Sequence, residues 1–478
     1  MPPRPPRYLA LADSLLQGLR AGRHRPGDRL PSVRELCTTH GLSLATVTHA
    51  LHRLEDAGWI ESRPRRGFFV RTLAEGPARP LPATAALQLE ERRQRLMALA
   101  AAREGLVSLG HLALAPAWLP LTALRRRLSG CLRAGPGVLA SGTVFGSRAL
   151  REQLAGRLTR AGVRIDAEDV VVTQGDGEFL QLCLGLLTRP GERIAVASPG
   201  SLRTLEVLAA LGLQPVELPA RLDGEDARPA LEAFLAQERP SACLIDLGLL
   251  AASAGAMSDA AKQALVDVMA AHRVAVIEFD LMGELHRGAE RGRPLKAFDT
   301  GDTVIHCASL ACVTGPGFSL GFVASGRHRL RLRAARAVHG ELIPHLSDQV
   351  LAGFLADDGF EAHLRRLRSR LRLQVAAWAR AVKRCFPAGT QVSAGDAGYV
   401  LWVTLPGGVA ATELLARARD GGYTFVPGGV FSASGRFDHC LRLTASHPLD
   451  EVRLAGLRLL GEAVGALLAA AGGGRQSG

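Results

Sequence analysis

The sequence predicts a multidomain protein: a small, mostly helical N-terminal domain with a β-hairpin, then a large α/β domain that ends in a smaller α+β lobe. The chain has 478 residues, which is enough for two or three domains with their own cores. Apolar residues recur at helical spacing in the first part of the chain, and a Pro/Gly/Ala-rich stretch follows. Beyond that stretch, β-like apolar runs alternate with helical ones, the pattern of a largely parallel sheet covered by helices.

The N-terminal domain is predicted from three helices and a hairpin. Residues 8–20 have helical apolar spacing, and a second short helix begins at Pro31. Ser43 is placed as the N-cap of a third helix over residues 44–57. Residues 59–70 read as two short strands around a basic turn. Three helices and such a hairpin form a winged helix-turn-helix, whose third helix enters the major groove of DNA.

The charge of the chain agrees with a polyanionic partner for its beginning. The formal net charge is +13, and residues 1–72 hold twelve arginines against six acidic groups. The eight cysteines are scattered singly, so we expect free thiols and no metal site. We also expect no membrane contact and a cytoplasmic location, because the sequence has neither an apolar run long enough to span a membrane nor a signal-peptide pattern.

The first seventy residues or so resemble the DNA-binding domain of the GntR family. The resemblance rests on three runs: Pro26-Gly-Asp-Arg-Leu-Pro-Ser-Val-Arg-Glu-Leu36, Gly41-Leu-Ser-x-x-Thr-Val47 and Leu54-Glu-x-x-Gly-Trp-Ile-Glu-Ser-Arg-Pro64. It implies a double-stranded DNA operator as partner, contacted by Arg34, Ser43, Thr46, His49, Arg63 and Gly67. Two departures stand out. Leu44 replaces an arginine that the family usually carries, and Arg65 and Arg66 stand where the family has a Gly-Ser wing tip, which adds two phosphate-seeking charges.

The rest of the chain predicts the α/β domain and its lobe. The β-like runs of the large domain are 170–173, 193–197, 274–279, 303–306 and 321–324, and those of the lobe are 399–405 and 441–443. We place the boundaries at 5–73 for the winged helix-turn-helix, 74–105 for a linker, 106–345 for the large domain, 346–470 for the small lobe and 471–478 for a disordered tail.

This region resembles fold-type I aminotransferases, and specifically the effector domain of the MocR-type regulators within the GntR family. The resemblance is carried by residues 304–322, which end in Pro-Gly-x-x-Leu-Gly, together with residues 114–120 and 363–368. It implies an α/β fold-type I aminotransferase-like domain that dimerises with a second copy. The cofactor of the family is pyridoxal phosphate, held as a Schiff base by a lysine.

The positions that would hold this cofactor have changed. The lysine position is Cys312, and a thiol cannot form a Schiff base. The three lysines of the chain lie elsewhere, at 262, 296 and 383. Family residues that stack on the cofactor ring or bond the cofactor are replaced by Ser201, Phe279, Leu281, Ser319 and the apolar loop 249–254. We therefore expect no enzyme activity, no catalytic residue and no resident cofactor, with pyridoxal phosphate binding at most weakly and without a covalent bond.

Some elements of the pocket remain. Gly175, Asp176 and Gly177 lie in a strand-to-helix turn that could offer backbone N–H groups to a phosphate, although such a turn is often only a tight connection. Asp280 matches a family acidic position, but a loop-bonding carboxylate is the favoured interpretation. Arg442 matches the arginine that clamps a substrate carboxylate, so it would bind a small carboxylate effector. A salt-bridged arginine that closes the lobe is the open alternative.

Together these features predict a sequence-specific DNA-binding transcriptional regulator with a catalytically inactive, aminotransferase-like effector-binding and dimerisation domain. Two alternatives stay open. One is a pyridoxal-phosphate-dependent enzyme fused to a DNA-binding domain, which the missing lysine opposes. The other is a dimerisation scaffold that binds no ligand, which the sequence does not separate from the first hypothesis.

Overall fold

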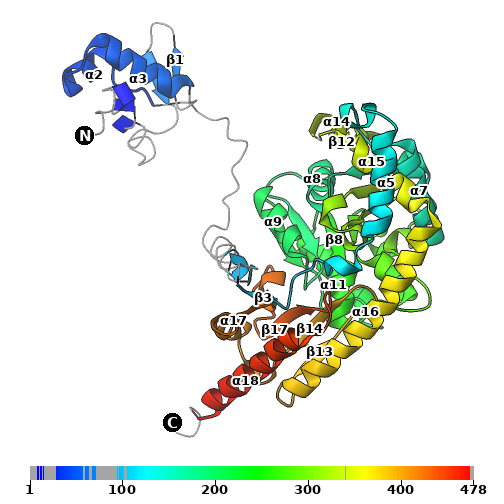
Figure 1. Cartoon of the computed structure of the whole chain (residues 1–478). Coiled ribbons are helices and arrows are strands. Elements are labelled where there is room, and N and C mark those ends of the chain that lie inside the picture. The colour runs from blue at the N-terminus through cyan, green and yellow to red at the C-terminus, as the bar shows by residue number, and fades with distance from the viewer. Residues whose placement is uncertain are drawn as a thin grey trace. The chain divides into compact units, whose positions relative to one another are not determined.

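The computed structural model describes residues 8–9, 11–12, 14–15, 28–56, 60–63, 67–70, 94, 96–98, 100–101, 105–339 and 341–473. The chain divides into two compact units, residues 1–81 and 82–478 (Figure 1).

The first unit is a winged helix-turn-helix, as the sequence predicts. Its elements are α2 (Val33–His40), α3 (Leu44–Asp56), β1 (Ile60–Arg63) and β2 (Gly67–Val70). The two strands pair antiparallel, with Arg63 opposite Gly67. The described residues between 8 and 15 are helical, and Leu11 and Ala12 pack with α2 and α3 in one small core. Of the predicted wing tip, Arg65 and Arg66 lie outside the described residues, and Gly67 begins β2.

A seven-stranded sheet forms the centre of the second unit, in the order β5-β11-β10-β9-β8-β6-β7. Its strands are β5 (Val170–Thr173), β6 (Arg193–Val196), β7 (Gln214–Glu217), β8 (Ala242–Asp246), β9 (Ala275–Asp280), β10 (Val304–Ser309) and β11 (Gly321–Ala324). Neighbouring strands are parallel except at β11, which runs antiparallel to both β5 and β10. The predicted largely parallel sheet is confirmed, with this one reversed strand.

The sheet is buried on both faces because its strands alternate two sets of apolar side chains. In β6, Ile194 and Val196 pack toward α8 (Asp176–Leu187), α9 (Leu202–Ala210) and α14 (Arg329–His339), whereas Ala195 packs toward α10 (Ala227–Glu238) and α12 (Asp259–Ala271). Further helices pack around this core: α5 (Leu121–Arg133), α6 (Gly137–Ala140), α7 (Arg148–Arg160), α11 (Leu247–Ala254), α13 (Ala311–Thr314) and α15 (His345–Leu355). Short 3-10 turns lie between the longer elements, at η1 (Pro116–Trp118), η2 (Ala167–Asp169), η3 (Gly283–Leu285), η4 (Leu295–Phe298), η5 (Pro316–Phe318) and η6 (Pro406–Gly408).

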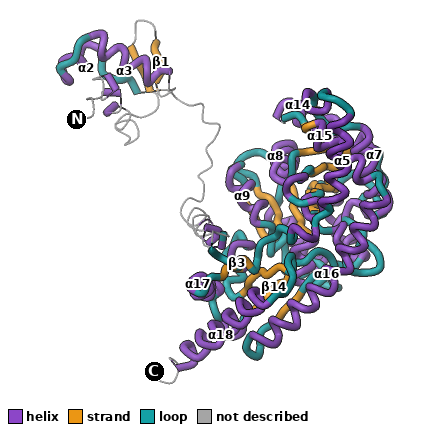
Figure 2. Tube along the Cα trace, viewed as in Figure 1, coloured by secondary structure: helices purple, strands orange, loops and turns teal. Residues whose placement is uncertain are grey.

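The C-terminal lobe holds a four-stranded antiparallel sheet in the order β13-β14-β17-β16, with long helices beside it (Figure 2). Its strands are β13 (Gln391–Ser393), β14 (Val400–Thr404), β16 (Val426–Pro427) and β17 (Cys440–Thr444), and its helices are α16 (Asp358–Cys385), α17 (Ala411–Asp420) and α18 (Glu451–Gly473). The predicted runs 399–405 and 441–443 correspond to β14 and β17. Helix α18 continues to Gly473, past the predicted start of the tail, and residues 474–478 lie outside the described part.

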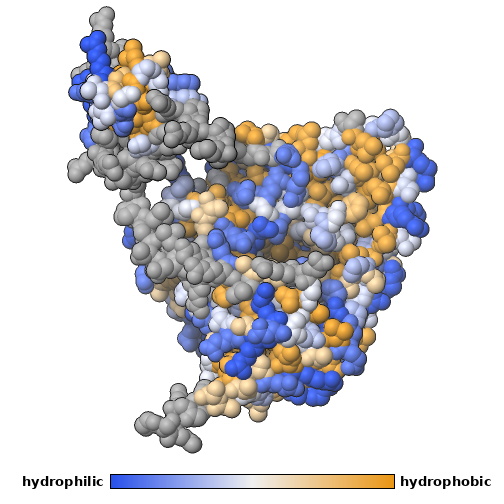
Figure 3. All heavy atoms as spheres, turned by 60° about the vertical axis from the view of Figure 1, so that its left-hand side comes forward, coloured by the Kyte–Doolittle hydropathy of each residue, from blue (hydrophilic) through white to orange (hydrophobic). Residues whose placement is uncertain are grey.

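The predicted linker, residues 74–105, is described only near its end. There Leu96 and Ala100 are buried in the main core of the second unit. Farther on, β3 (Val107–Ser108) pairs parallel with β15 (Tyr423–Thr424) of the lobe, so the chain enters the second unit along its C-terminal part. The surface in Figure 3 is a mosaic of hydrophobic and hydrophilic residues. Within the described residues, no helix is long and apolar enough to cross a bilayer.

Candidate functional site

The start of α3 is fixed by its own polar residues. Ser32 caps α2 in a reciprocal capping box with Glu35, and Gly41 ends that helix in the left-handed conformation at φ 62°. Ser43 Oγ then accepts a hydrogen bond from Thr46 N at 3.3 Å and lies 2.8 Å from Thr46 Oγ1. The predicted N-cap is therefore in place, and both hydroxyls take part in it.

One face of α3 is buried and the other is exposed. Val47, Ala50, Leu51 and Leu54 are buried at the spacing of a core-facing helical stripe. The wing is attached to the end of the helix, because Ser62 N donates to Glu55 Oε1 at 2.8 Å. The exposed face of α3 is thus held in a fixed position beside the hairpin.

The predicted DNA-contact residues that the structure describes belong to α2, α3 with its cap, and β2. Arg34 is exposed on α2, and Ser43 and His49 are exposed at the cap and on the body of α3. The His49 ring also stacks on the Tyr8 ring, with centroids 4.1 Å apart and planes 4° apart, so one of its faces packs against the first helical segment. Gly67 has a φ of 98°, a conformation that favours glycine. Arg65, Arg66 and the side chain of Arg63 lie outside the described part.

Leu44 was noted in the sequence only as a departure from the family. In the structure it is the first residue of α3, and its side chain is 62% exposed. Its position in the sequence could have indicated this exposure. Leu44 follows the N-cap directly and comes before the residues that form the buried stripe of the helix.

In the second unit, a cleft of about 530 Å³ lies between the sheet domain and the lobe. Its lining is mixed, with the carboxylates of Asp176 and Asp246, the guanidinium of Arg442, and apolar groups such as Leu281 and Phe431. Ser201, which stands at the family's ring-stacking position, is also part of the wall. Met97 and Ala101 line the cleft from the segment that leads into the second unit.

Cys312 lies on α13 beside this cleft and offers no amine. The Tyr399 hydroxyl is 3.9 Å from its Sγ, and burial raises the pKa of the Cys312 thiol to about 11, so the thiol is un-ionised at neutral pH. Lys262 Nζ donates to the Arg293 carbonyl at 2.8 Å, and Lys296 Nζ is bound by Asp299 and Asp302. Lys383 lies in the last turn of α16. None of the chain's lysines lines the cleft.

The position that the resemblance assigns to the carboxylate beside the pyridine nitrogen is apolar. Phe279 is fully buried, and its ring makes an edge contact with Phe179 at 4.9 Å between centroids. The next residue, Asp280, is bound within the protein: it pairs with Arg291 and accepts from Gly283 N at 2.8 Å. The Arg291 charge holds the pKa of Asp280 below its usual value in spite of burial. Asp280 is therefore a structural carboxylate.

At the end where a phosphate would sit, Asp176 is acidic, whereas the charge of Glu178 is balanced by Arg336, whose Nε lies 2.8 Å from Glu178 Oε1. Gly175, at φ 94°, precedes α8, whose first turn contains Asp176 and Glu178. Gln174 N already donates to Glu178 Oε2 at 2.6 Å. Ser319, at the family's phosphate-binding arginine position, carries no positive charge. Pyridoxal phosphate needs an amine, a partner for its ring nitrogen and cationic or N–H donors for its phosphate. These residues do not fit it.

Arg442 faces the cleft from β17. Its Nη2 donates to the Gly110 carbonyl at 3.0 Å, and its Cζ lies 5.0 Å from the centre of the Phe431 ring. Its Nε is buried and has no hydrogen-bond partner among the described residues. Burial lowers the pKa of the guanidinium to about 10, so it keeps its charge at neutral pH.

Asp246 was missed by the sequence analysis. It ends β8, caps α11 by accepting from Leu249 N at 3.0 Å, and is 9% exposed. Burial raises the pKa of its carboxyl to about 6, and the Arg442 charge acts in the opposite direction. The cleft therefore contains a carboxyl that titrates near neutral pH.

The Phe431 wall is fixed by a hydrogen-bonded loop. Phe431 belongs to the 3-10 turn η7 (Gly428–Phe431), and its carbonyl accepts from Gly200 N at 2.8 Å. Glu217 then accepts from Ser432 Oγ at 2.7 Å and from Ala433 N at 2.8 Å. These contacts hold the aromatic ring against Arg442.

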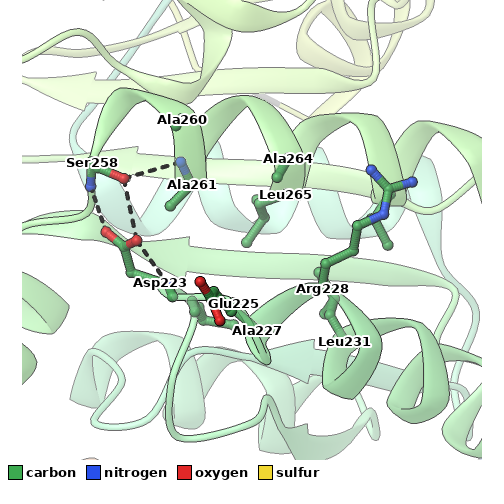
Figure 4. A pocket seen from close by; sticks show the side chains of 13 residues that line it. Asp223, Glu225, Ala227, Arg228, Leu231, Ser258, Ala260, Ala261, Ala264 and Leu265 are labelled. Atoms are coloured by element: carbon green, nitrogen blue, oxygen red, sulfur yellow. Dashed lines mark hydrogen bonds between the residues drawn. The ribbon is translucent and has the colours of Figure 1, made fainter.

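A second cavity, of about 350 Å³, lies between α10 and α12. Figure 4 shows the hydrogen bonds that link Asp223, Ser258 and Ala261 at one end of this cavity. Asp223 accepts from Ser258 N at 2.8 Å and from its Oγ at 3.2 Å, and the same Oγ caps α12 through Ala261 N. None of the predicted site residues lies here. No group of His, Cys, Asp or Glu in the described ranges could hold a metal ion.

Comparisons with known proteins agree with both units. Residues 7–70 match the model of the bacterial regulatory proteins of the gntR family. An uncharacterized HTH-type transcriptional regulator of Escherichia coli (strain K12), YdcR, is 29% identical over 464 residues, which cover 96% of this chain and 99% of that protein. The HTH-type transcriptional regulator TauR of Rhodobacter capsulatus is 28% identical over 463 residues, 88% of each chain.

The second unit has a solved counterpart. The alpha-aminoadipate aminotransferase LysN of Thermus thermophilus matches with a TM-score of 0.69 and 27% identity, over 80% of this chain and 99% of that one. The chain has the MocR-type architecture. It joins a GntR helix-turn-helix domain to an aminotransferase-like domain.

Proposed function

We propose that this MocR-type protein is a sequence-specific DNA-binding transcriptional regulator whose aminotransferase-like unit binds a small effector and performs no catalysis. One observation carries the proposal. Regulators with the same arrangement align along nearly the whole chain, from the GntR domain to the end of the lobe. A protein that reads an operator works where the DNA is, so we place it in the cytoplasm.

Selection of duplexes from a random library with the full-length protein tests DNA binding. We expect enrichment of a site with two related half-sites, since a dimer presents two recognition helices. Enrichment of no sequence would overturn the proposal. Activity with amino acids and added pyridoxal phosphate would instead support the alternative of an enzyme with a DNA-binding appendage.

We propose further that pyridoxal phosphate is not a resident cofactor. Cys312 offers no amine, Phe279 no charge for the ring nitrogen, and Asp176 opposes a phosphate. The ultraviolet-visible spectrum of the protein mixed with pyridoxal phosphate should lack an internal aldimine band, and borohydride should trap no adduct. A reducible yellow adduct that maps to Lys296 or Lys262 would contradict this.

The effector that suits the cleft is a small carboxylate with an apolar body. Arg442 holds one buried N–H without a partner among the described residues, and Phe431 and Leu281 add apolar surface. A guanidinium in such surroundings needs a counter-charge, which an anion from solution would provide. If no carboxylate stabilises the protein, the alternative of a scaffold that binds no ligand is favoured.

We propose that the second unit also pairs with a second copy. Its described surface carries large exposed apolar side chains, among them Leu139 on α6 and Leu342 just before β12 (Ile343–Pro344). These two flank the ribbon in which β12 pairs with β4 (Gly142–Thr143). Burial of such a patch against its own copy removes apolar surface from water.

A further inference from the structure

The exposure of Leu44 has no explanation within the first unit. Of the large apolar side chains in the described part of this unit, it is the one that stands strongly exposed, at 62%. The core of the unit does not need it, because Val47, Ala50, Leu51 and Leu54 already fill the buried face of α3. An exposed leucine at a fixed position is a candidate contact for an apolar partner.

The position of Leu44 is rigid. The left-handed Gly41 and the Ser43 cap set the direction in which α3 begins, and Leu44 follows the cap directly. Ser43 and Thr46 are hydrogen-bonded to each other across this first turn, which leaves Leu44 and the exposed Ala45 as its apolar surface. The tip of the helix therefore combines satisfied polar groups with a projecting apolar side chain.

In a helix-turn-helix protein, the N-terminal residues of the second helix of the motif reach the base edges of the major groove. The apolar group on those edges is the 5-methyl of thymine. We propose that Leu44 reads a thymine in each half-site by contact with this methyl group. The inference rests on the proposed DNA-binding function and adds a base preference to it.

The test uses the full-length protein and the site obtained by library selection. Each thymine of one half-site is replaced in turn by deoxyuridine, which removes the methyl group and keeps every hydrogen-bonding atom. At one position, this change should weaken wild-type binding about fourfold, the value that corresponds to burial of a single methyl group. The Leu44→Ala variant should bind the thymine and deoxyuridine duplexes equally well, because the methyl group then has no partner.

Leu373→Ala is the matched control. Leu373 is a similarly exposed leucine, at 68%, but it lies on α16 of the other unit, so this variant should keep the full loss of affinity for the deoxyuridine duplex. An equal melting temperature for wild type and Leu44→Ala shows that the comparison concerns folded protein.

The possible outcomes separate the two hypotheses. If the library yields no enriched site, the proposed function itself fails. If a site is enriched but the loss of affinity for the deoxyuridine duplex is the same in wild type and Leu44→Ala, DNA binding stands and the assignment of Leu44 is overturned. The assignment is also overturned if Leu44→Ala changes only the molar mass of the protein in solution, because Leu44 then serves a protein contact.

Discussion

Arg442 and Asp246 carry opposite charges in the same cleft, and each is costly to bury. Arg442 has an Nε without a partner among the described residues, and Asp246 is a 9%-exposed carboxyl whose pKa is raised to about 6. Substitutions at these residues therefore separate structural roles from ligand-binding ones.

Asp246→Asn should stabilise the protein at neutral pH. Asparagine keeps an oxygen that accepts from Leu249 N, and it removes the buried charge. The folded-state pKa of about 6 lies above the ordinary value of 3.8. Above pH 6 the charge therefore destabilises the folded protein by its full amount. This destabilisation shrinks below pH 6, because the folded protein takes up a proton, and it is absent below about pH 4. The gain should reach about 3 kcal/mol above pH 6.

Thermal melts at pH 7.5 and pH 5.0 measure this gain, and Asp223→Asn is the matched control. Hydrogen bonds from the Ser258 backbone hold the pKa of Asp223 below its usual value, so loss of that charge should lower the melting temperature at pH 7.5. A lower melting temperature for Asp246→Asn at pH 7.5 would mean that its charge is required, most simply by Arg442.

Arg442→Leu should abolish stabilisation by carboxylates. Benzoate at ten times its Kd should stabilise the wild type by about 1.4 kcal/mol, whereas uncharged benzamide should have no such effect. The benzoate effect should be larger at pH 5.5 than at pH 7.5, since protonation of Asp246 removes a repelling charge from the cleft. Differential scanning fluorimetry measures both, and binding of the variant to DNA should be unchanged.

A structural arginine would give the opposite pattern. The melting temperature of Arg442→Leu without ligand would then fall, because the bond to the Gly110 carbonyl is lost. No carboxylate would raise the melting temperature of the wild type. That result would favour the scaffold alternative.

At the level of elements, the sequence predicts strands best where their apolar runs are flanked by turns. The runs 170–173 and 321–324 have the same bounds as β5 and β11. Strand β8 was not predicted, because its apolar residues continue directly into the apolar helix α11, and periodicity cannot divide such a run. Asp246 marks this division as the cap of α11, and it was missed together with the strand.

The candidate site could be predicted only as a set of departures from the family. Sequence spacing placed Phe279, Cys312 and Arg442, but the environment of each depends on residues that are distant in the chain. The ion pair of Asp280 with Arg291, the Phe431 ring over Arg442 and the raised pKa of Asp246 all arise from tertiary packing. No local pattern encodes them.

The wing should supply affinity for DNA that does not depend on the base sequence. Replacement of Arg65 and Arg66 by alanine should weaken binding to every duplex and reduce the salt slope by about two, if both side chains contact phosphate. Fluorescence anisotropy over a series of salt concentrations measures the slope. Replacement of Arg372 and Arg380, two exposed arginines on α16, is the control for the loss of two charges. An unchanged slope in the wing variant would show that the wing does not contact DNA.

At the scale of the whole molecule, the exposed leucines beside the β4–β12 ribbon predict self-association. The double variant Leu139→Asp, Leu342→Asp places two charges in the patch, and it should shift the mass measured by light scattering from twice 50.6 kDa to 50.6 kDa. Leu373→Asp, at an equally exposed leucine on α16, should leave the mass unchanged. A single-copy mass for the wild type would contradict the pairing itself.

The wall formed by Met97 and Ala101 connects the cleft to the chain that leads back to the first unit. A molecule that fills the cleft would touch this segment. Its binding free energy would therefore depend on whether Leu96 and Ala100 stay packed in the core. The coupling is reciprocal. If the ligand changes the equilibrium for packing of the segment by some factor, packing of the segment changes the affinity for the ligand by the same factor. Occupancy of the cleft and the packing of this segment against the core are therefore two sides of a single equilibrium.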